Sequence, residues 1–474
     1  MKYLLKNVGN KLRNQFVRPG DRLITHFAVA IILALFFYLS GGSALFTSDS
    51  GAYLLNAREL KVPGDRSIFY SCFIHYASEY IRLFHEPHVI EIVLIQALIA
   101  YAIIFVFFKN FFQKQNQWIV LIAIILFYCL TPFPWLLLQI MPDLFTCLVF
   151  FSALLFLKSK DAIGSFLLSL LLIFCLIMHN STVLLFFLFS GGILLARKKL
   201  EVFNFVKSRF LQMFLVSIFA ILCVVGTNLY AKKGFTLASA SHIFLMGKLS
   251  ENGVLKKYLD KYCETEPNLL CAYKDKLPEH GWDFVWESNG AFANSGGWDH
   301  SDTLYKKIIA KTLRDSDLLL ANINAALKGT FQQILLTGAG DGIGKMDTAG
   351  TLVSELRNFY PYDYQRLMET SKQQKEEINF SEFNRWYAIF QWIFILASIL
   401  IIVKFKNKYH IGLFLMAIYF SFCNAFITGA LANIINRLNT KGIVVLVCIS
   451  MLIVLDQCYN QYIQYRLKNG SGSV

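Results

Sequence analysis

Leu23–Phe46, a long apolar run, followed by Thr47-Ser48-Asp49-Ser50-Gly51-Ala52-Tyr53, is the stretch that decides the fold of this chain. The apolar run exceeds the roughly 20 residues that a helix needs to cross a hydrocarbon core about 30 Å thick. Asp49 therefore stands where a membrane helix would meet water. Its carboxylate is either a solvated helix end or a functional group at the membrane surface, and the rest of the chain bears on this choice.

The composition indicates a membrane-embedded chain. Of 474 residues, 56% are hydrophobic and only 16% are charged, whereas soluble domains contain about 25% charged residues. Apolar windows of about 18 or more residues recur along the sequence. We therefore expect an all-α integral membrane protein with about ten transmembrane helices, interfacial helices in the first outer loop and one large extracytoplasmic helical domain.

The basic residues indicate how the helices are oriented. A net charge of +14 would suggest nucleic acid in a soluble protein. Here the lysines and arginines lie mostly in short loops between apolar segments, as they do on the cytoplasmic side of membrane proteins, so we expect no nucleic-acid partner. Both termini are expected in the cytoplasm. The basic residues of the N-terminal arm are Lys2, Lys6, Lys11, Arg13, Arg18 and Arg22.

The alternation of apolar and polar segments predicts three regions. Residues 1–230 form a membrane domain of about seven helices, whose first outer loop, residues 47–88, holds two amphipathic segments in the interface plane. Residues 231–385 form an extracytoplasmic domain, and residues 386–474 form about three membrane helices with a cytoplasmic tail. The predicted membrane helices are Leu23–Phe46, Val89–Phe108, Trp118–Leu130, Pro142–Lys158, Ala162–Met178, Thr182–Ala196, Phe210–Tyr230, Trp386–Val403, Ile411–Ala430 and Gly442–Cys458.

Two features of the polar block bear on function. Cys263 and Cys271 lie in it, and the chain contains no C-x-x-C pair, which argues against a zinc or redox motif. If the block lies outside the cytosol, these two cysteines are candidates for a disulfide. The run Gly338–Gly344 lacks the spacing of a dinucleotide or phosphate loop, and we expect it to be a flexible linker without a nucleotide.

Polar residues from several helix ends meet on the outer face in this topology. Ionisable groups near membrane helices are unfavourable unless they are paired or used. Asp143 begins a helix, so it is either an N-terminal capping group or a substrate-binding group. His179 is either a solvated helix end or a ligand, and Asp65 with Arg66 is either a local salt bridge or part of the same site. The remaining members are Asp49, His75, which is more simply structural, and Arg437.

Arg437 differs from the other basic residues because it lies between two apolar helices on the side where positive charge is disfavoured. An arginine there can hold a phosphate in bidentate geometry, belonging either to a lipid headgroup or to a lipid-phosphate substrate. A carboxylate such as Asp49 can deprotonate an acceptor hydroxyl, while an arginine stabilises charge on the leaving phosphate. The pair therefore suits group transfer from a lipid-phosphate donor.

The acid after the first membrane helix, the interfacial segments behind it and the large extracytoplasmic segment resemble the plan of the GT-C superfamily. This superfamily of polytopic glycosyltransferases includes protein O-mannosyltransferases and aminoarabinose transferases. The resemblance implies a GT-C-like fold and a polyprenyl-phosphate-linked sugar donor. It implies that Asp49 is the catalytic base or, as in some branches, the ligand of a divalent cation, Mg²⁺ or Mn²⁺. The segment Gly247–Trp286 is similar to bacterial membrane proteins of this plan, which implies a bacterial inner membrane.

We therefore expect a membrane glycosyltransferase that moves a sugar from this donor to an extracytoplasmic glycan, lipid or protein. Asp49 is the expected catalytic residue. The expected substrate-binding residues are Asp143, His179, Arg437, Arg66 and Asp65. Expected partners are the sugar donor, membrane lipid and the acceptor. Two alternatives stay open: a lipid or polysaccharide transporter or flippase, against which the lack of an internal repeat weighs, and a non-catalytic membrane assembly factor.

Overall fold

The computed structural model describes residues 23–81, 83–112 and 117–468. Within these ranges the protein is helical throughout, and its only β-type pairing is one isolated parallel bridge between Leu45 and Gln139. Among the described residues, five helices are long and apolar enough to cross a membrane: Val89–Phe111, Lys207–Tyr230, Phe380–Phe405, Lys408–Leu431 and Asn436–Tyr465. The protein is thus an all-α membrane protein, as its composition predicts. The basic N-terminal arm lies outside the described residues.

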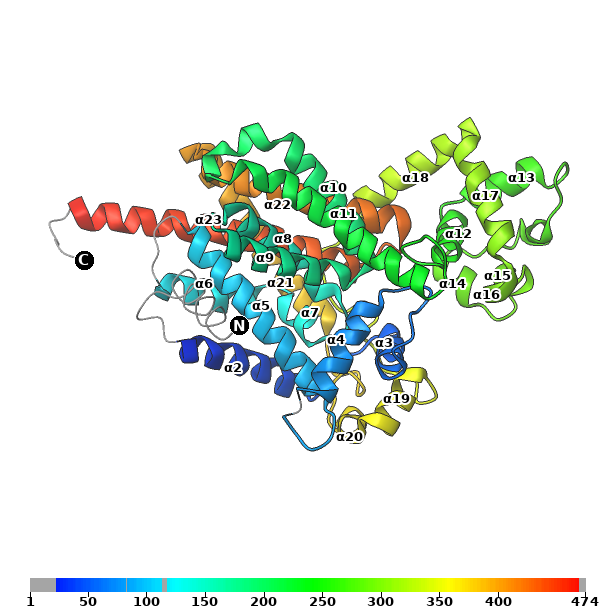
Figure 1. Ribbon diagram of the computed structural model, residues 1–474, viewed down its shortest axis with the longest axis horizontal. Helices are drawn as coiled ribbons and strands as arrows, with labels where there is room; N and C mark the ends of the chain where they lie inside the picture. The colour runs from blue at the N-terminus through cyan, green and yellow to red at the C-terminus, as the bar shows by residue number, and fades with distance from the viewer. Residues whose placement is uncertain (1–22, 82, 113–116, 469–474) are drawn as a thin grey trace.

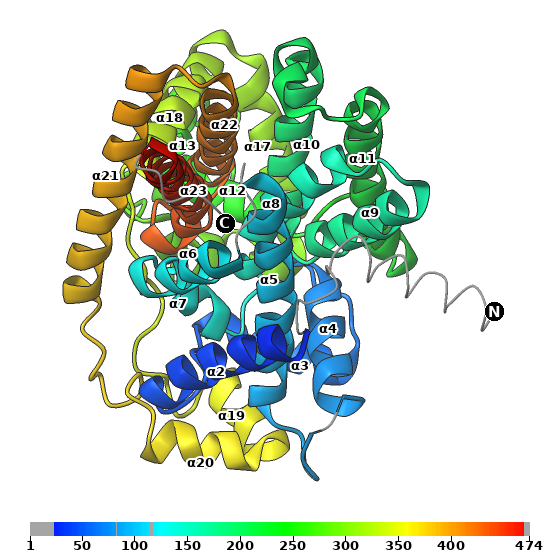
Figure 2. The same ribbon diagram turned by 90° about the vertical axis from the view of Figure 1, so that its left-hand side faces the viewer.

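Every apolar segment predicted from the sequence forms a helix. These helices are α2 (Leu23–Gly41), α5 (Val89–Phe111), α6 (Gln117–Leu130), α8 (Asp143–Lys158), α9 (Ala162–Ile177), α10 (Asn180–Leu195), α11 (Lys207–Tyr230), α21 (Phe380–Phe405), α22 (Lys408–Leu431) and α23 (Asn436–Lys468). They form a bundle in which α23 is largely buried and contacts α22, α21, α8 and α6, while α21 lies at the edge (Figure 2). The shorter helices, of 14 to 19 residues, extend about 21–29 Å at 1.5 Å per residue.

The first helix ends at Gly41 and not at Phe46, where the sequence predicted its end. The cause is Gly42, whose φ of +79° is a left-handed conformation that terminates a helix. Beyond it the chain is extended, and the Leu45 nitrogen donates to the Leu138 oxygen at 3.0 Å. The segment 47–53, which contains Asp49, is thereby held near the short helix α7 (Phe133–Leu138), which leads into α8.

The last helix begins at Asn436 and not at Gly442. The N-terminus of α23 is stabilised by a residue from another segment of the chain, because the carboxylate of Asp341 accepts a hydrogen bond from the Asn436 nitrogen. Arg437 and Lys441 therefore lie on α23 itself and not in a loop. Because they are four residues apart, their side chains share one face of that helix.

The two amphipathic segments of the first outer loop form α3 (Ser48–Glu59) and α4 (Ile68–Glu79), which pack against each other. A third helix, α19 (Thr351–Phe359), covers α3 at Gly51. A Cβ atom on Gly51 would lie 2.5 Å from the Leu352 nitrogen, closer than atoms can approach. Gly51 is therefore required for the packing of α19, which returns to the bundle from the polar block.

The polar block, predicted as one domain over residues 231–385, contributes residues to two hydrophobic cores. Residues 240–318, which we call the protruding domain, build a hydrophobic core of their own. The later helices α19 and α20 (Pro361–Glu369) bury their leucines in the core of the membrane bundle, near α2 and α3. Figure 1 shows the protruding domain at one end of the bundle and α19 and α20 below α3.

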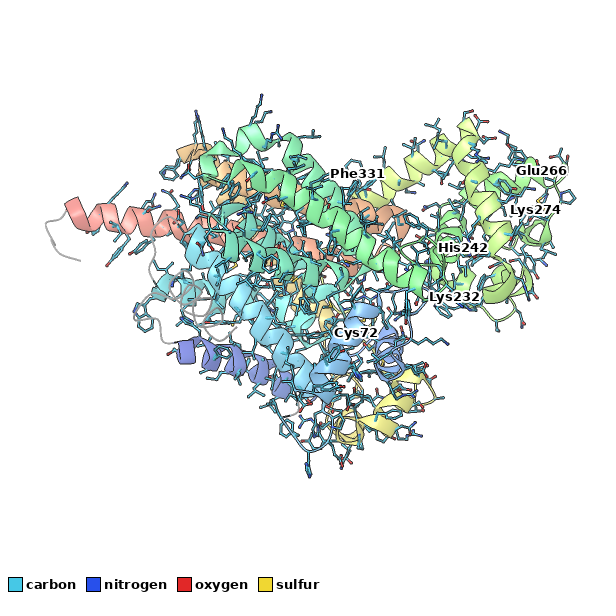
Figure 3. The ribbon with its side chains drawn as sticks, viewed as in Figure 1. Cys72, Lys232, His242, Glu266, Lys274 and Phe331 are labelled. Atoms are coloured by element: carbon cyan, nitrogen blue, oxygen red, sulfur yellow. A yellow bond between two sulfur atoms is a disulfide. The ribbon has the colours of Figure 1, made fainter. Side chains whose placement is uncertain are left out.

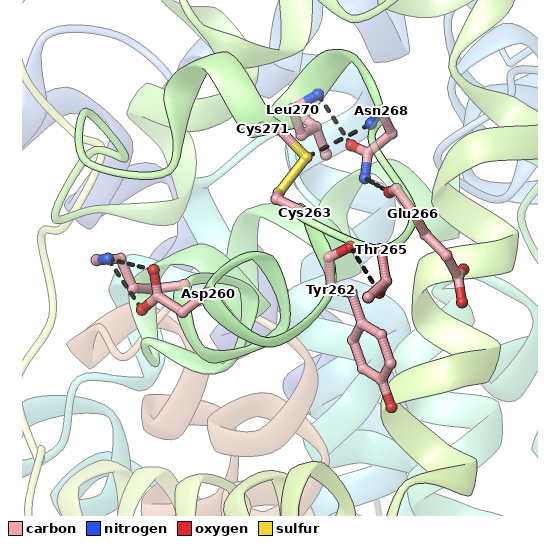
Figure 4. Close-up of a disulfide and its surroundings, with 9 residues drawn as sticks. Asp260, Tyr262, Cys263, Thr265, Glu266, Asn268, Leu270 and Cys271 are labelled. Carbon is pink, nitrogen blue, oxygen red and sulfur yellow. Dashed lines mark hydrogen bonds and ion pairs between the residues drawn. A yellow bond between two sulfur atoms is a disulfide. The ribbon is translucent and has the colours of Figure 1, made fainter.

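The protruding domain consists of short helices. They are α12 (Ser241–Glu251), α13 (Val254–Tyr262), α14 (Gly281–Trp286), α15 (Ala291–Asn294), α16 (Gly297–His300), α17 (Asp302–Arg314) and the start of α18 (Ser316–Ile334). The predicted disulfide between Cys263 and Cys271 is present and closes the loop after α13 (Figure 4). Glu266 and Lys274, labelled in Figure 3, lie far from the membrane helices.

Helix α18 connects the protruding domain to the bundle. Its first turns join the protruding core through Leu318, and its later turns pack along α22. The two helices touch backbone to backbone, because a Cβ atom on Gly329 would lie 2.4 Å from the Gly429 oxygen. Close approach through small residues is how helices associate in membranes, where lipid removes the hydrophobic driving force.

The glycine run Gly338–Gly344 is not a free linker, as the sequence predicted, but a loop held against the bundle. The Gly338 nitrogen donates to the Asn436 side chain at 3.0 Å, and the Ala339 nitrogen donates to the Asn384 side chain at 2.8 Å. Gly342 then passes so close to Arg437 that a Cβ atom would lie 3.4 Å from its Nη1. The loop therefore forms one wall around the Arg437 guanidinium.

Candidate functional site

Asp49 lies in the first turn of α3, beside the end of the extended segment that follows α2. The turn is capped locally, since the Thr47 nitrogen donates to Ser50 Oγ at 2.9 Å. A carboxylate at this position also gains from the helix dipole. The Asp49 side chain is 39% exposed, so it is open to a ligand although it belongs to a charged cluster.

Two arginines that are distant in sequence hold the two oxygens of the Asp49 carboxylate. Arg66 Nη2 lies 3.3 Å from Oδ1, and its Nη1 donates to the Asp49 backbone oxygen at 3.0 Å. Arg437 Nη2 donates to Oδ2 at 3.3 Å. Arg66 also donates through Nε to Asp65 at 2.9 Å. Desolvation by burial lowers the pKa of Arg66, but the hydrogen bond to Asp65 and the nearby charges outweigh it, so the pKa of Arg66 is raised.

A second ion pair lies behind this one and is closed to solvent. Lys441 Nζ donates to Asp143 Oδ1 at 2.9 Å, and the side chains are 0% and 1% exposed. Arg437 Nε lies 3.9 Å from Asp143 Oδ2, which is an ion pair but too long for a hydrogen bond. Arg437 therefore joins the exposed acid Asp49 to the buried acid Asp143. A buried charge is strongly destabilising when its partner is missing, so this pair fixes where Arg437 stands.

His179 caps the N-terminus of α10 next to the cluster. Its Nδ1 accepts a hydrogen bond from the Ser181 nitrogen at 3.2 Å. Burial lowers the pKa of His179 to about 3, and the positive charge of Lys441 acts in the same direction, while Asp143 opposes both. The imidazole is therefore neutral near pH 7, and because Nδ1 accepts a hydrogen bond, its Nε2–H can donate one to a ligand.

The structure thus brings together all six residues named as the candidate site: Asp49, Asp65, Arg66, Asp143, His179 and Arg437. His75 is not among them. It lies on α4 against the rings of Tyr76 and Tyr80, at centroid distances of 5.5 and 5.8 Å. Lys441 belongs to the cluster, although it was not among the site residues predicted from the sequence. Its spacing of four residues from Arg437 was the available signal, because residues four apart share one face of a helix.

The cluster does not suit the divalent cation that the family resemblance implies. Both oxygens of Asp49 and one oxygen each of Asp65 and Asp143 already accept from arginine or lysine. A Mg²⁺ or Mn²⁺ ion would have to replace these cations as well as repel them. Among the residues that the structure describes, no group of three or more His, Cys, Asp or Glu could hold a metal ion. We assign no step to a metal.

A cavity of about 970 Å³ opens beside the cluster and shares Asp65 and His179 with it. This volume is at the upper end of the roughly 300–1,000 Å³ of small-molecule sites. It lies between α10 and α22 of the bundle and α12 and α17 of the protruding domain, near Lys232 and His242 in Figure 3. Its apolar lining comes mainly from Leu184, Phe244, Leu245, Ile309, Ile427 and Leu431.

The part of the cavity lined by α12 and α17 carries another polar group. His242 Nε2 lies 2.7 Å from Asp302 Oδ1, and Lys306 pairs with the same carboxylate. Burial lowers the pKa of His242, although Asp302 opposes the shift. The cavity therefore combines ionisable groups with an apolar lining, which fits a ligand that has both polar and apolar parts. These residues could not be found from sequence, because they come from two helices of the protruding domain.

No protein-family model matches the sequence, and no curated protein and no solved structure matches it either.

Proposed function

We propose that the protein is a membrane glycosyltransferase that moves a sugar from a polyprenyl-phosphate-linked donor to an extracytoplasmic acceptor. The observation that carries the proposal is the bridge Arg66–Asp49–Arg437, with contacts of 3.3 Å on each side of a half-exposed carboxylate, next to a cavity of about 970 Å³. In this arrangement the carboxylate can act as a base, and the two guanidinium groups can bind a phosphate.

The arginines bind the donor phosphate in this proposal. In the free protein the Asp49 carboxylate pairs with both Arg66 and Arg437. A phosphate that enters the site takes over hydrogen bonds from these guanidinium groups, which prefer bidentate contact with phosphate oxygens. Arg437 keeps its position because it also pairs with Asp143, which Lys441 holds in place. The carboxylate of Asp49 is thereby released to face the acceptor.

In the proposed transfer step, one bond forms and one bond breaks at the anomeric carbon of the sugar. The acceptor hydroxyl oxygen forms a bond to the anomeric carbon of the sugar, and its proton passes to the Asp49 carboxylate, which is the general base. The bond between the anomeric carbon and the phosphate oxygen breaks, and the electron pair leaves with the polyprenyl phosphate. Arg66 and Arg437 stabilise the charge on that leaving group. His179 and Asp65, which line the cavity, orient the acceptor by hydrogen bonds.

The proposal includes a GT-C-like fold with ten crossings in a bacterial inner membrane, with both termini cytoplasmic and the protruding domain outside. The short helices are compatible with it, since helices shorter than the hydrocarbon core can be accommodated by local thinning. The orientation can be tested by replacing Lys274 or Lys408 with cysteine, in a variant whose exposed Cys129 and Cys458 are serine. A membrane-impermeant maleimide should label position 274 in intact cells, and labelling of position 408 alone would contradict the orientation.

The activity can be tested directly with purified protein in detergent and radiolabelled polyprenyl-phosphate sugars. We expect turnover by the wild type and a loss of about 10²–10⁴-fold in Asp49→Asn, the usual contribution of a general base. Asp275→Asn is the matched control, because Asp275 is an exposed acid of the protruding domain. The proposed activity would be contradicted if the wild type turned over none of the sugars offered, or if Asp49→Asn and wild type had equal rates.

A second candidate, a transporter or flippase of lipid-linked phosphate, is favoured by one observation. Besides the pair of Asp143 and Lys441, the bundle contains His410 and Asp456, with Nε2 and Oδ2 3.0 Å apart and side chains 0% and 1% exposed. Ionisable pairs inside a membrane often mark a translocation path. In proteoliposomes, lipid-phosphate movement that is lost in Asp456→Asn, without sugar transfer, would favour the transporter over the enzyme.

A further inference from the structure

A groove of about 610 Å³ lies at the end of the bundle opposite the charged cluster. It runs between the last turn of α10, the first half of α22 and the short 3-10 helix that follows α10 (Arg197–Phe203). Its walls are apolar, with Ile193, Leu415 and Met416 among the lining residues. Leu415 is 58% exposed on a helix that is long and apolar enough to cross a membrane, so the groove faces lipid and not water.

The groove is shaped by aromatic rings that close on helix backbones. Gly192 on α10 lies under the phenol of Tyr419, whose oxygen would be 2.2 Å from a Cβ atom there. The same hydroxyl donates to the Leu188 oxygen at 2.9 Å. Gly412 on α22 similarly accommodates the ring of Phe203, which would be 2.6 Å from a Cβ atom. These contacts fix the floor and one end of the groove, so its form does not depend on mobile side chains.

The mouth of the groove is basic. Lys199 and Lys408 line it, both are exposed, and neither has an ion-pair partner among the described residues. The flanking exposed basic residues are Arg197, Lys198, Lys404 and Lys406. The one acid that the sequence places in the 3-10 helix is Glu201. Positive charge thus collects at one end of an apolar, lipid-facing groove.

We infer that this groove binds one anionic phospholipid, with an acyl chain against Ile193 and Leu415 and the headgroup phosphate between Lys199 and Lys408. Apolar walls alone would accept any lipid, and lysines alone would accept any anion. Their combination selects a molecule that has both a chain and a negative headgroup. Basic pockets between membrane helices bind anionic lipid headgroups for this reason. The site lies at the other end of the bundle from Asp49 and does not depend on the proposed function.

Native mass spectrometry of the detergent-purified protein tests this inference. The probes are palmitoyl-oleoyl phosphatidylglycerol and phosphatidylcholine, which have the same chains but differ in headgroup charge. Each basic residue near an anionic lipid contributes about fivefold in affinity. We therefore expect phosphatidylglycerol to bind about 25-fold more tightly than phosphatidylcholine. The variant Lys199→Gln/Lys408→Gln should lose this difference.

Three controls complete the experiment. Lys274→Gln/Lys276→Gln, in the protruding domain, should bind phosphatidylglycerol as the wild type does. Ala196→Trp, which fills the groove without changing its charge, should weaken both lipids. Inorganic phosphate at about 10 mM should not displace the lipid, because it lacks a chain.

The inference would be overturned by any of three results. Equal binding of both lipids to the wild type would show that headgroup charge is not recognised. Unchanged binding in Ala196→Trp would place the lipid elsewhere. Displacement by inorganic phosphate would reduce the site to a phosphate-binding surface. Size-exclusion profiles of the variants should match the wild type, so that loss of binding reports the site and not the fold.

Discussion

Replacing Lys441 with methionine should destabilise the protein far more than a single lysine substitution usually does. Lys441 and Asp143 form an ion pair at 2.9 Å with side chains 0% and 1% exposed. Methionine has nearly the same length but no charge. The substitution therefore leaves the Asp143 carboxylate inside the protein without its nearest cation, while the packing around position 441 changes little.

The magnitude follows from the two cations near Asp143. At an effective dielectric constant of about 20, the contact with Lys441 corresponds to about 6 kcal/mol of Coulomb attraction and the 3.9 Å contact with Arg437 to about 4 kcal/mol. Arg437 remains in Lys441→Met, so the carboxylate keeps part of its compensation. Breaking a buried pair destabilises proteins by about 3–5 kcal/mol, and we expect a value near the lower end, about 3 kcal/mol.

The assay is reversible unfolding of the purified protein in mixed micelles, followed by tryptophan fluorescence, for four proteins: wild type, Lys441→Met, Asp143→Leu and the double variant. A buried pair replaced on both sides by apolar groups is often neutral. The double variant should therefore recover at least half of the loss. A loss below about 1 kcal/mol in Lys441→Met, or a double variant whose loss equals the sum of the single losses, would refute the argument that the pair is buried and coupled.

Three further predictions concern other parts of the fold. Gly51→Val should destabilise the protein by about 1–3 kcal/mol, as overpacking does, because a Cβ atom would lie 2.5 Å from the Leu352 nitrogen. Trypsin should then cleave the variant faster near α19. A variant as resistant to trypsin as the wild type would contradict this packing. Replacing Cys263 and Cys271 by serine should lower the stability of the protruding domain by about 2.5 kcal/mol, from the entropy of a loop this short, and reduction of the wild type should reproduce the effect in thermal melts. Burial lowers the pKa of His242, so the unfolded state binds more protons than the folded state as the pH falls through about 6.5. The free energy of unfolding of the protruding domain should therefore decrease from pH 7 to pH 5. This decrease should be smaller in His242→Gln.

Local patterns in the chain were sufficient to identify most of the secondary structure. The predicted Ala162–Met178 helix matches Ala162–Ile177, and the predicted Phe210–Tyr230 helix lies within Lys207–Tyr230. The largest differences occurred at helix ends, such as Gly41 and Asn436, where a left-handed glycine or a carboxylate from elsewhere sets the boundary. Helix interiors follow from apolar periodicity, but their ends depend on partners that can be distant in sequence.

The polar block shows where composition fails. The helices α12 and α19 are both amphipathic and both lie between the same two membrane helices in sequence, yet the first enters the protruding core and the second enters the bundle. What separates them is the surface available to each. The bare backbone at Gly51 offers α19 a place to dock on α3, a match that exists only once both helices are formed.

The sequence by itself determined that this chain belongs in a membrane and that Asp49 lies beside the end of its first apolar helix, because hydrophobic length and charge are local properties. Only the tertiary structure decided that Arg66 and Arg437, 17 and 388 residues away, bind the two oxygens of that carboxylate. It also decided that Asp143 and Lys441 are buried behind Arg437. Such pairings arise from how α3, α8 and α23 cross, and this crossing depends on the shapes of many side chains at once.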